Sequence, residues 1–282
     1  MKAGLIGDRI GGSLTPLMHE TEGQALGIAY SYVRIDTAEA PHAVKPLSAL
    51  IEAAEADGFA GLNITHPFKV DAVSLADELS GIARDLGAIN TLVLRDGRRV
   101  GHNTDYAGFR AALARDLPDQ AFEKVALFGA GGAGLAVALA LIDHGASELC
   151  VVDTEPQKAD ALARQMKTVR PDARVTAGPV DLALLDGAVN ATPLGMAGYP
   201  GMAFDPARLS PDAWVADIVY FPLNTPLLAA ARGQGRRVMS GAGMALFQAV
   251  AAFELITGQR PDPGRMQATL EAALQRMADA GR

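Results

Sequence analysis

The segment KVALFGAGGAGLAVALALIDHG, residues 124–145, constrains the fold of this chain most strongly. An apolar run leads into glycines spaced G-x-G-x-x-G, and an alanine-rich helical pattern follows. Strand, glycine loop and helix in this order predict a dinucleotide-binding βαβ unit, in which the glycines permit a tight turn, the approach of a pyrophosphate and close helix–strand packing. The alternative is a close-packed turn that binds no ligand. The expected loop residues are Gly129, Ala130, Gly131, Gly132, Ala133 and Gly134.

An acidic residue follows the next predicted strand at the distance where the ribose of a dinucleotide is bound. Asp153 in VVDTE lies about 20 residues beyond the glycines, where a carboxylate accepts a hydrogen bond from the ribose 2′-hydroxyl and repels a 2′-phosphate. Lys158 is the only cation nearby and is expected to be an exposed helix charge. These residues favour NAD over NADP. The alternative for Asp153 is a plain helix N-cap.

A second polar loop follows a later strand of the same half. Asn190, Thr192 and Pro193 in NATPLGM stand at the strand edge that faces the nicotinamide end of a dinucleotide. We expect them to bind the cofactor, and ordinary turn chemistry is the alternative.

The first third of the chain alternates strand-like and helical patterns. Strands are expected near 3–7, 30–35 and 61–65, and helices at 16–27 and 41–57, an order typical of a mostly parallel sheet. Residues 88–105 contain two strand-like runs around Asp-Gly, which predicts an antiparallel hairpin.

The remaining patterns predict a two-domain α/β protein. The N-terminal domain is expected to be a mixed-sheet α/β substrate domain, and the following domain a Rossmann-type dinucleotide-binding domain. A helix near 104–116 joins them, and the cleft between them is the expected ligand site. The expected boundaries are 1–103, 104–240 and 241–282, the last being helices that pack back on the first domain.

Charge and cysteine content exclude several classes of protein. The net charge of −7 argues against a nucleic-acid surface, and no apolar run approaches the ~20 residues of a membrane span. The single cysteine, Cys150, permits no intrachain disulfide. No His, Cys and Asp set has metal-site spacing, so no metal is expected. We expect a cytoplasmic protein, monomer or homodimer, with a small-molecule substrate.

Small polar residues recur after successive strands of the first half. Because ligands of open α/β sheets lie at the carboxyl ends of strands, these residues predict a pocket of hydroxyls and amides that suits a polyhydroxylated ring. Each residue alone could be a cap or turn residue. They are Ser13, Thr15, Asn63, Thr65 and Asn90.

Lys69 in NITHPFK and Asp105 in GHNTD are the charged pair among these loops. Oxidation of an alcohol by NAD removes a hydride from carbon and a proton from oxygen. A lysine accepts that proton well once a partly dry cleft lowers its pKa, and an aspartate beside it holds it in place. We therefore predict that Lys69 and Asp105 are catalytic, and a solvated surface lysine is the alternative.

Several ordered motifs together resemble the shikimate/quinate dehydrogenase family over nearly the whole chain. They are SLTP, NITHPFK, GAINT, GHNTD, GAGGAG, NATPLGM, DIVYFPLNTPLL and GMALFQAV. The resemblance implies that Lys69 and Asp105 form the catalytic dyad and that Ser13 and Thr15 bind a carboxylate. The residues implied as partners of that carboxylate or of the ring hydroxyls are Asn63, Thr65, Asn90, Tyr220 and Gln248.

The resemblance also implies a reaction, the reversible oxidation of the C3 hydroxyl of shikimate or quinate. Biosynthetic members typically carry Asn-Arg-Ser/Thr after the second cofactor strand, where the arginine binds the NADP phosphate, whereas this chain has Asp153 and Thr154. Together with Thr15, His66 and His102 this departure resembles the NAD-using quinate/shikimate branch, for which a catabolic or dual role is expected.

Three alternatives stay open on the sequence alone. The first is an NADP-dependent biosynthetic shikimate dehydrogenase. The second is a non-catalytic protein that binds NAD or a metabolite on the same fold, against which the retained Lys69 and Asp105 argue. The third is another two-domain enzyme with a catalytic lysine, such as the methylenetetrahydrofolate dehydrogenases.

Overall fold

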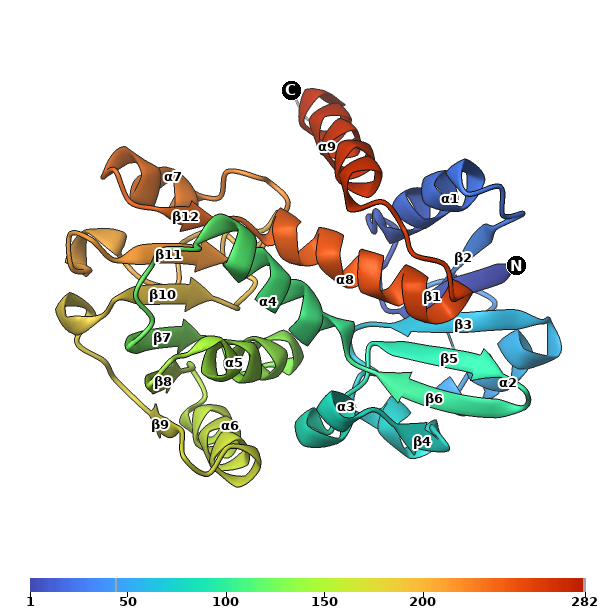
Figure 1. The fold of residues 1–282 in the computed structure, drawn as a ribbon, viewed down its shortest axis with the longest axis horizontal. Helices are drawn as coiled ribbons and strands as arrows, with labels where there is room; N and C mark the ends of the chain where they lie inside the picture. Colours follow the sequence, from blue (N-terminus) through green and yellow to red (C-terminus); the bar gives the residue numbers. More distant parts are fainter. Residues whose placement is uncertain (44, 281–282) are drawn as a thin grey trace. The chain divides into compact units, whose positions relative to one another are not determined.

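The structure is a computed structural model that describes residues 1–43 and 45–280. The chain divides into one unit formed by Met1–Thr104 and Leu246–Arg282 and a second formed by Asp105–Ala245. Each unit contains one six-stranded sheet (Figure 1). Residues 44 and 281–282, which fall within the predicted helical segments 41–57 and 241–282, lie outside the described residues. None of the helices described combines the length and the apolar character needed to cross a membrane.

The first sheet is mixed, as the sequence predicts. Its order is β2-β1-β3-β5-β6-β4, with β1 parallel to β2 and β3, and β5 antiparallel to β3 and β6. The predicted hairpin is confirmed, because Asp96 and Gly97 connect β5 to β6 with φ of 54° and 70°, as a two-residue turn of this hand requires. The strands are β1 (Lys2–Gly7), β2 (Ser31–Asp36), β3 (Phe59–Ile64), β4 (Glu78–Leu79), β5 (Thr91–Arg95) and β6 (Arg98–His102).

The helices expected at 16–27 and 41–57 are present as α1 and α2, with shifted bounds. The helix expected at 41–57 begins only at Leu47, because Pro46 is its extended N-cap residue and a proline disfavours helical backbone in the residue before it. Ile51 on this helix packs with Leu62 and Ile64 of β3 in the core. The elements are α1 (Thr15–Ala25), α2 (Leu47–Ala56), η1 (Asp71–Leu75) and α3 (Gly81–Leu86).

The second sheet is parallel throughout its strand pairs, with the order β12-β11-β10-β7-β8-β9. From β7, the strands β8 and β9 are added toward one edge of the sheet, whereas β10, β11 and β12 are added toward the other edge. The strand order therefore reverses between β7 and β10, and doubly wound sheets bind their ligands at such a switch point. The predicted α/β class is confirmed. The strands are β7 (Lys124–Phe128), β8 (Glu148–Val152), β9 (Arg174–Ala177), β10 (Gly187–Asn190), β11 (Trp214–Asp217) and β12 (Val238–Met239).

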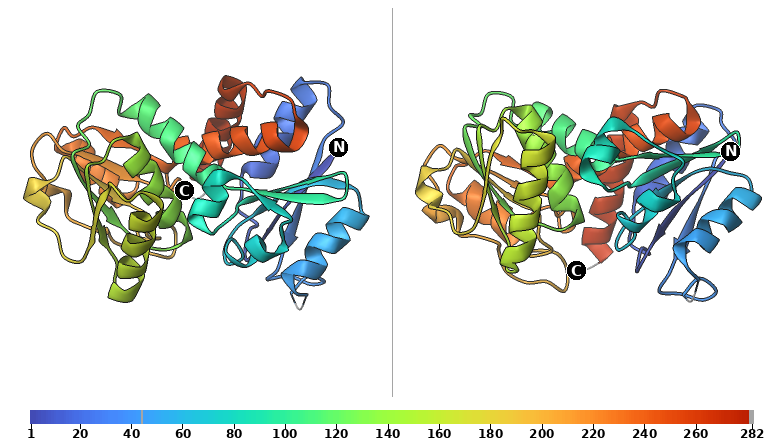
Figure 2. Two further views of the ribbon diagram at one scale, coloured as in Figure 1. Left: turned by 60° about the horizontal axis from the view of Figure 1, so that its bottom comes forward. Right: turned by 90° about the horizontal axis from the view of Figure 1, so that it is seen from below.

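Helices cover both faces of this second sheet. Figure 2 shows α5 and α6 beside the strands that they connect. Leu182 of η2, Leu209 after η3 and residues of α7 pack in a separate cluster with Ala126, Ala188 and Val215. The predicted joining helix is present as α4. The elements are α4 (Thr104–Asp116), α5 (Gly132–His144), α6 (Pro156–Val169), η2 (Leu182–Leu184), η3 (Pro206–Arg208) and α7 (Pro226–Gly233).

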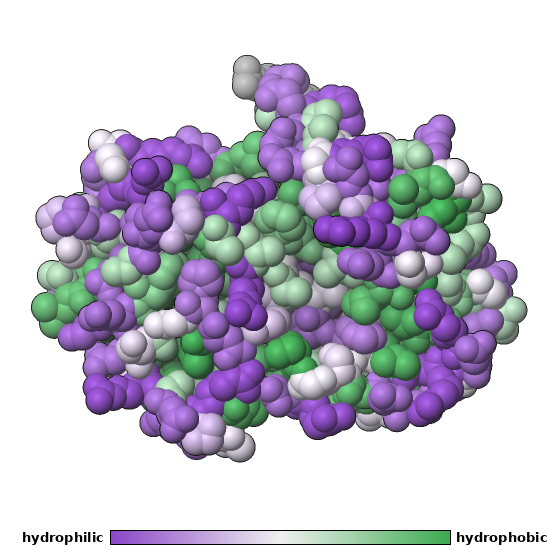
Figure 3. Space-filling model, in the orientation of Figure 1, coloured by the Kyte–Doolittle hydropathy of each residue, from purple (hydrophilic) through white to green (hydrophobic). Residues whose placement is uncertain are grey.

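Two helices end the chain, α8 (Gly241–Thr257) and α9 (Pro263–Ala280). Met266, Leu270 and Leu274 of α9 are buried at helical spacing, and α9 packs against α1. On the face drawn in Figure 3, α9 shows mainly hydrophilic residues. Helix α9 is therefore an amphipathic helix of the first unit.

Candidate functional site

The glycine loop has the backbone geometry that the motif requires. Gly129 has φ of +104°, and a Cβ there would lie 2.7 Å from the backbone of Ala191. A Cβ on Gly134 would lie 2.1 Å from the carbonyl oxygen of Gly129, so only glycine permits this contact between helix and strand. Gly131 has no other atom within 4 Å of the position of a Cβ, which leaves space for a ligand. The loop therefore fits a pyrophosphate at the start of α5.

Replacing Gly134 with alanine is expected to raise the Kd for NAD about tenfold, roughly 1.4 kcal/mol. The added methyl group would collide with the Gly129 carbonyl, so the loop must move away from the geometry that holds the phosphates. Titration calorimetry measures the effect. Gly233→Ala is the matched control, since nothing lies within 4 Å of its Cβ position. Unchanged NAD affinity in Gly134→Ala would contradict this role of the loop.

Asp153 lies directly after β8 and organises the glycine loop. Its carboxylate accepts hydrogen bonds from Ala130 N at 2.7 Å and from Glu155 N at 2.9 Å. Burial alone would raise the pKa of Asp153, but these two N–H groups, together with the charge of Lys158 and the hydroxyl of Thr154, outweigh it and hold the pKa below its ordinary value. The N-cap alternative is wrong, because Glu155 is the N-cap residue of α6. Lys158 is exposed and pairs with Glu155, as expected of a helix surface charge.

The side chain of Asn190 forms hydrogen bonds within the protein. It is fully buried, donates to Asp217 Oδ1 at 2.9 Å and to the Leu194 carbonyl at 3.0 Å, and accepts from Thr192 N and Oγ1. These bonds shape the turn after β10, which also carries Pro193. Turn chemistry therefore accounts for Asn190, while the cofactor-binding role of this turn stays a prediction.

Asp217 links this turn to the stability of the second unit. Burial raises the pKa of Asp217 above its ordinary value of 3.8, against hydrogen bonds from Thr225, Val219 and Asn190. The folded state therefore holds the proton more tightly than the unfolded state does. The contribution of this group to stability is complete below pH 3.8 and is lost as the pH rises through the folded pKa.

Asp217→Asn removes this titration and keeps the size of the side chain. We expect the free energy of unfolding of the unaltered protein to fall relative to that of the variant between pH 4 and pH 7. Urea unfolding of both proteins at the two pH values measures the difference. A difference that does not change with pH would contradict the assignment.

The segment that leads into Ser13 and Thr15 is held by a residue that sequence reasoning missed. The buried carboxylate of Asp36, at the end of β2, accepts hydrogen bonds from the backbone N–H groups of Arg9 and Ile10 at 2.9 and 2.8 Å. Burial opposes ionisation of Asp36, but its backbone hydrogen bonds prevail and lower its pKa. Its position at the end of a parallel strand was the available signal.

The predicted amide residues of the first unit form a buried network. Asn63 accepts from the Tyr32 hydroxyl at 2.7 Å and donates to Thr91 Oγ1 at 3.0 Å. Asn90 donates to Thr104 Oγ1 at 3.0 Å and accepts from Thr104 N at 2.6 Å. Both amides thus support the strand ends and the start of α4, and their contact with a substrate stays a prediction.

Lys69 is half-buried, and its carbonyl accepts from Ile89 N at 2.8 Å. Because Asn90 follows Ile89, the Lys69 backbone lies close to the predicted pocket residues of the first unit. Thr65 also lies at this edge, with its N–H donating to the Ile6 carbonyl of β1 at 2.9 Å.

The other predicted residues are divided between the units. Gln248 lies on α8 within the first unit, whereas Asp105, buried in the first turn of α4, and Tyr220, after β11, belong to the second. Burial raises the pKa of Tyr220, so its hydroxyl stays protonated at neutral pH. The pairing of Lys69 with Asp105 stays a prediction.

Comparison with known proteins gives one consistent result. Residues 5–92 match the model of the shikimate dehydrogenase substrate binding domain. The chain is 47% identical to the quinate/shikimate dehydrogenase (NAD(+)) of Corynebacterium efficiens over 94% of this chain and 96% of that protein. It is also 47% identical to the shikimate dehydrogenase (NADP(+)) of Streptomyces avermitilis, over 95% and 94%. The quinate dehydrogenase of Corynebacterium glutamicum in complex with NAD superposes with a TM-score of 0.94, at 44% identity, covering 96% of this chain and 99% of the other.

Proposed function

The chain belongs to the shikimate/quinate dehydrogenase family, and on this premise we propose that it oxidises the C3 hydroxyl of shikimate, and of quinate as a second substrate, with NAD. The products are 3-dehydroshikimate and 3-dehydroquinate, and the reaction is reversible. The protein is thus an oxidoreductase that acts on a secondary alcohol of a polyhydroxylated ring acid.

Asp153 is the observation that carries the choice of cofactor. The relatives named for NAD and for NADP are equally similar to this chain, at 47% identity, so overall identity does not separate the two cofactors. A carboxylate bonded to the glycine loop, with Thr-Glu-Pro-Gln after it, offers acceptors to ribose hydroxyls and no arginine to a 2′-phosphate, and the one nearby lysine, Lys158, pairs with Glu155. NAD is therefore the cofactor that these residues fit.

The remaining residues have distinct roles in the proposed reaction. Ser13 and Thr15 donate hydroxyl hydrogen bonds to the carboxylate of the substrate and orient its ring. Lys69 accepts the proton of the C3 hydroxyl, and Asp105 is its partner in the dyad. Bound NAD supplies the acceptor for the hydride of C3.

Steady-state kinetics with both acids and both cofactors tests this function. We expect NADH absorbance to rise with NAD and shikimate or quinate, with a far higher kcat/KM for NAD than for NADP. Preference for NADP would favour the biosynthetic alternative. Binding of NAD with no turnover of either acid would favour the non-catalytic alternative.

A further inference from the structure

His19 lies on α1, fully buried among aromatic rings of the first unit. Its ring meets those of Tyr32 and Phe253 edge-on, with centroids 5.0 and 5.4 Å apart. Nδ1 lies 3.1 Å from the Tyr30 hydroxyl, and Nε2 lies 3.1 Å from the carbonyl oxygen of Ala249 on α8. Both ring nitrogens therefore have partners outside α1.

These contacts fix the tautomer of the ring. A carbonyl oxygen only accepts, so Nε2 carries the hydrogen and donates it to Ala249, and Nδ1 accepts from the Tyr30 hydroxyl. Burial lowers the pKa of His19 to about 3, although the bond to Ala249 opposes this shift. The ring is neutral throughout the neutral pH range and acts as a directed hydrogen-bond donor.

The partner of Nε2 stands next to a predicted substrate residue. Ala249 directly follows Gln248, and α1 begins at Thr15, next to Ser13. A helix moves largely as a rigid body, so a bond from the middle of α1 to the backbone of α8 sets the position of Gln248 relative to the Ser13–Thr15 turn.

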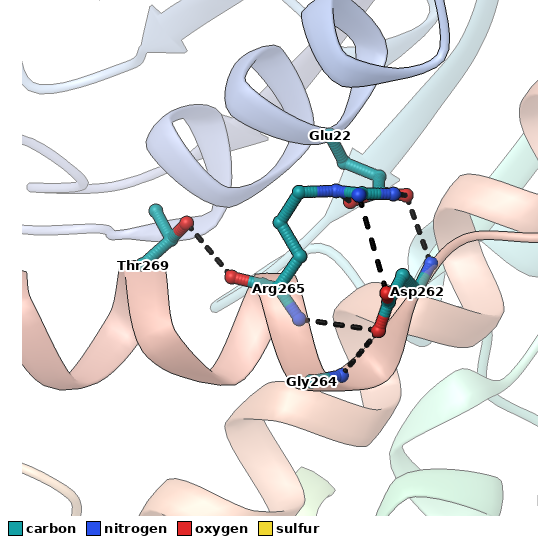
Figure 4. A network of polar contacts seen from close by, with 5 residues as sticks. All are labelled: Glu22, Asp262, Gly264, Arg265 and Thr269. Atoms are coloured by element: carbon teal, nitrogen blue, oxygen red, sulfur yellow. Dashed lines mark hydrogen bonds and ion pairs between the residues drawn. The ribbon is translucent and has the colours of Figure 1, made fainter.

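A second anchor lies three residues further along α1. Glu22, fully buried, accepts from Arg265 Nε at 2.7 Å, from Arg265 Nη2 at 2.9 Å and from Asp262 N at 2.8 Å (Figure 4). This pair holds the start of α9, so α1 anchors both C-terminal helices. None of these hydrogen bonds of Glu22 involves α8, so a variant of Glu22 is a useful control.

We propose that His19 is a positioning residue, which holds α8 by its Nε2–H bond to Ala249 and thereby aligns Gln248 with the carboxylate-binding turn. The proposal rests on the proposed function in one respect, namely that Gln248 contacts the acid substrate. If His19 has this role, loss of its Nε2–H bond should weaken binding of the acid substrate and leave binding of NAD unchanged.

Two matched replacements separate the roles of the two ring nitrogens. The amide nitrogen of glutamine reaches the place of Nε2, and that of asparagine reaches the place of Nδ1. We expect His19→Gln to keep the KM for shikimate within about twofold and His19→Asn to raise it about tenfold, roughly 1.4 kcal/mol. The KM for NAD should stay unchanged in both.

A double-mutant cycle distinguishes positioning from a general loss of structure. In a Gln248→Ala background, His19→Asn should raise the KM no further, because the group that it positions is gone. Glu22→Gln should lower the melting temperature and leave the KM for shikimate within about twofold. An equal effect of His19→Asn in both backgrounds, or equal effects of the two His19 variants, would overturn the proposal.

Calorimetric binding of shikimate to the unaltered protein separates failure of this inference from failure of the proposed function. If the unaltered protein binds shikimate and His19→Asn binds it equally well, only the positioning role fails. If the unaltered protein does not bind shikimate or quinate, the proposed function fails, and the positioning role with it.

Discussion

Replacement of Lys69 with alanine is expected to lower kcat by about 10²–10⁴, the range typical of the loss of a proton-transfer group. Without the amine, the proton of the C3 hydroxyl has no positioned acceptor as the hydride leaves. Lys69 belongs to the first unit and the glycine loop to the second, so NAD binding should persist. Steady-state kinetics and calorimetric NAD titration measure the two effects separately.

Lys45→Ala is the matched control for this experiment. Lys45 is an exposed lysine of the same unit, so its loss removes the same charge without removing a proposed catalytic group. We expect its kcat to equal that of the unaltered protein. A Lys69→Ala variant with full turnover would remove Lys69 from the mechanism.

Asp153→Ala is expected to weaken NAD binding by roughly tenfold to a hundredfold, since a hydrogen bond to a charged group contributes about 1.5–3 kcal/mol. The variant loses the acceptor for the ribose hydroxyls and the carboxylate that holds Ala130 N at 2.7 Å. NADP should suffer less, because the negative charge that repels its 2′-phosphate is also gone. Calorimetric titration of both cofactors gives the two affinities.

Asp153→Asn removes the negative charge and keeps one acceptor oxygen. Ala130 N donates to Oδ2 and Glu155 N to Oδ1, so the amide oxygen can accept from one of these N–H groups only, and part of the loop support is lost with the charge. We expect NADP to bind this variant more tightly than it binds the unaltered protein. Equal use of NAD and NADP by the unaltered protein would contradict the role of Asp153.

The sequence predicts best those features that depend on residues close together in the chain. Asp96-Gly97 adopts the left-handed backbone that a two-residue hairpin needs, and Gly129 and Gly134 occupy positions that exclude a side chain. The helix expected near 104–116 is α4, with those bounds. In each case the local conformational preference and the tertiary structure agree.

Contacts between residues far apart in the chain could not be predicted from local sequence patterns. Glu22 and Arg265 are 243 residues apart, and nothing local marks Glu22 as the buried member of an ion pair. Asp36 accepts a hydrogen bond from the N–H of Arg9, 27 residues before it, and so holds the segment that leads into Ser13. Strand β12, of two residues, is too short for a periodic pattern to reveal it.

Within the candidate site, a motif does not reveal whether an asparagine binds a ligand or stabilises the fold. An asparagine at a strand end can bind a ligand or complete a turn, and its residue type does not distinguish the two. The side-chain NH2 groups of Asn63 and Asn190 donate hydrogen bonds to acceptors within the protein. A motif that resembles a family's site therefore includes residues that build the site as well as residues that touch the ligand.

Isotope transfer from the substrate shows whether NAD oxidises the acid at C3. Shikimate that carries deuterium at C3 is mixed with the protein and NAD, and the reduced cofactor is analysed by mass spectrometry. We expect one deuterium on the nicotinamide ring and none in the solvent. Reduced cofactor without deuterium, or no reduction with either shikimate or quinate, would contradict oxidation at C3 by NAD.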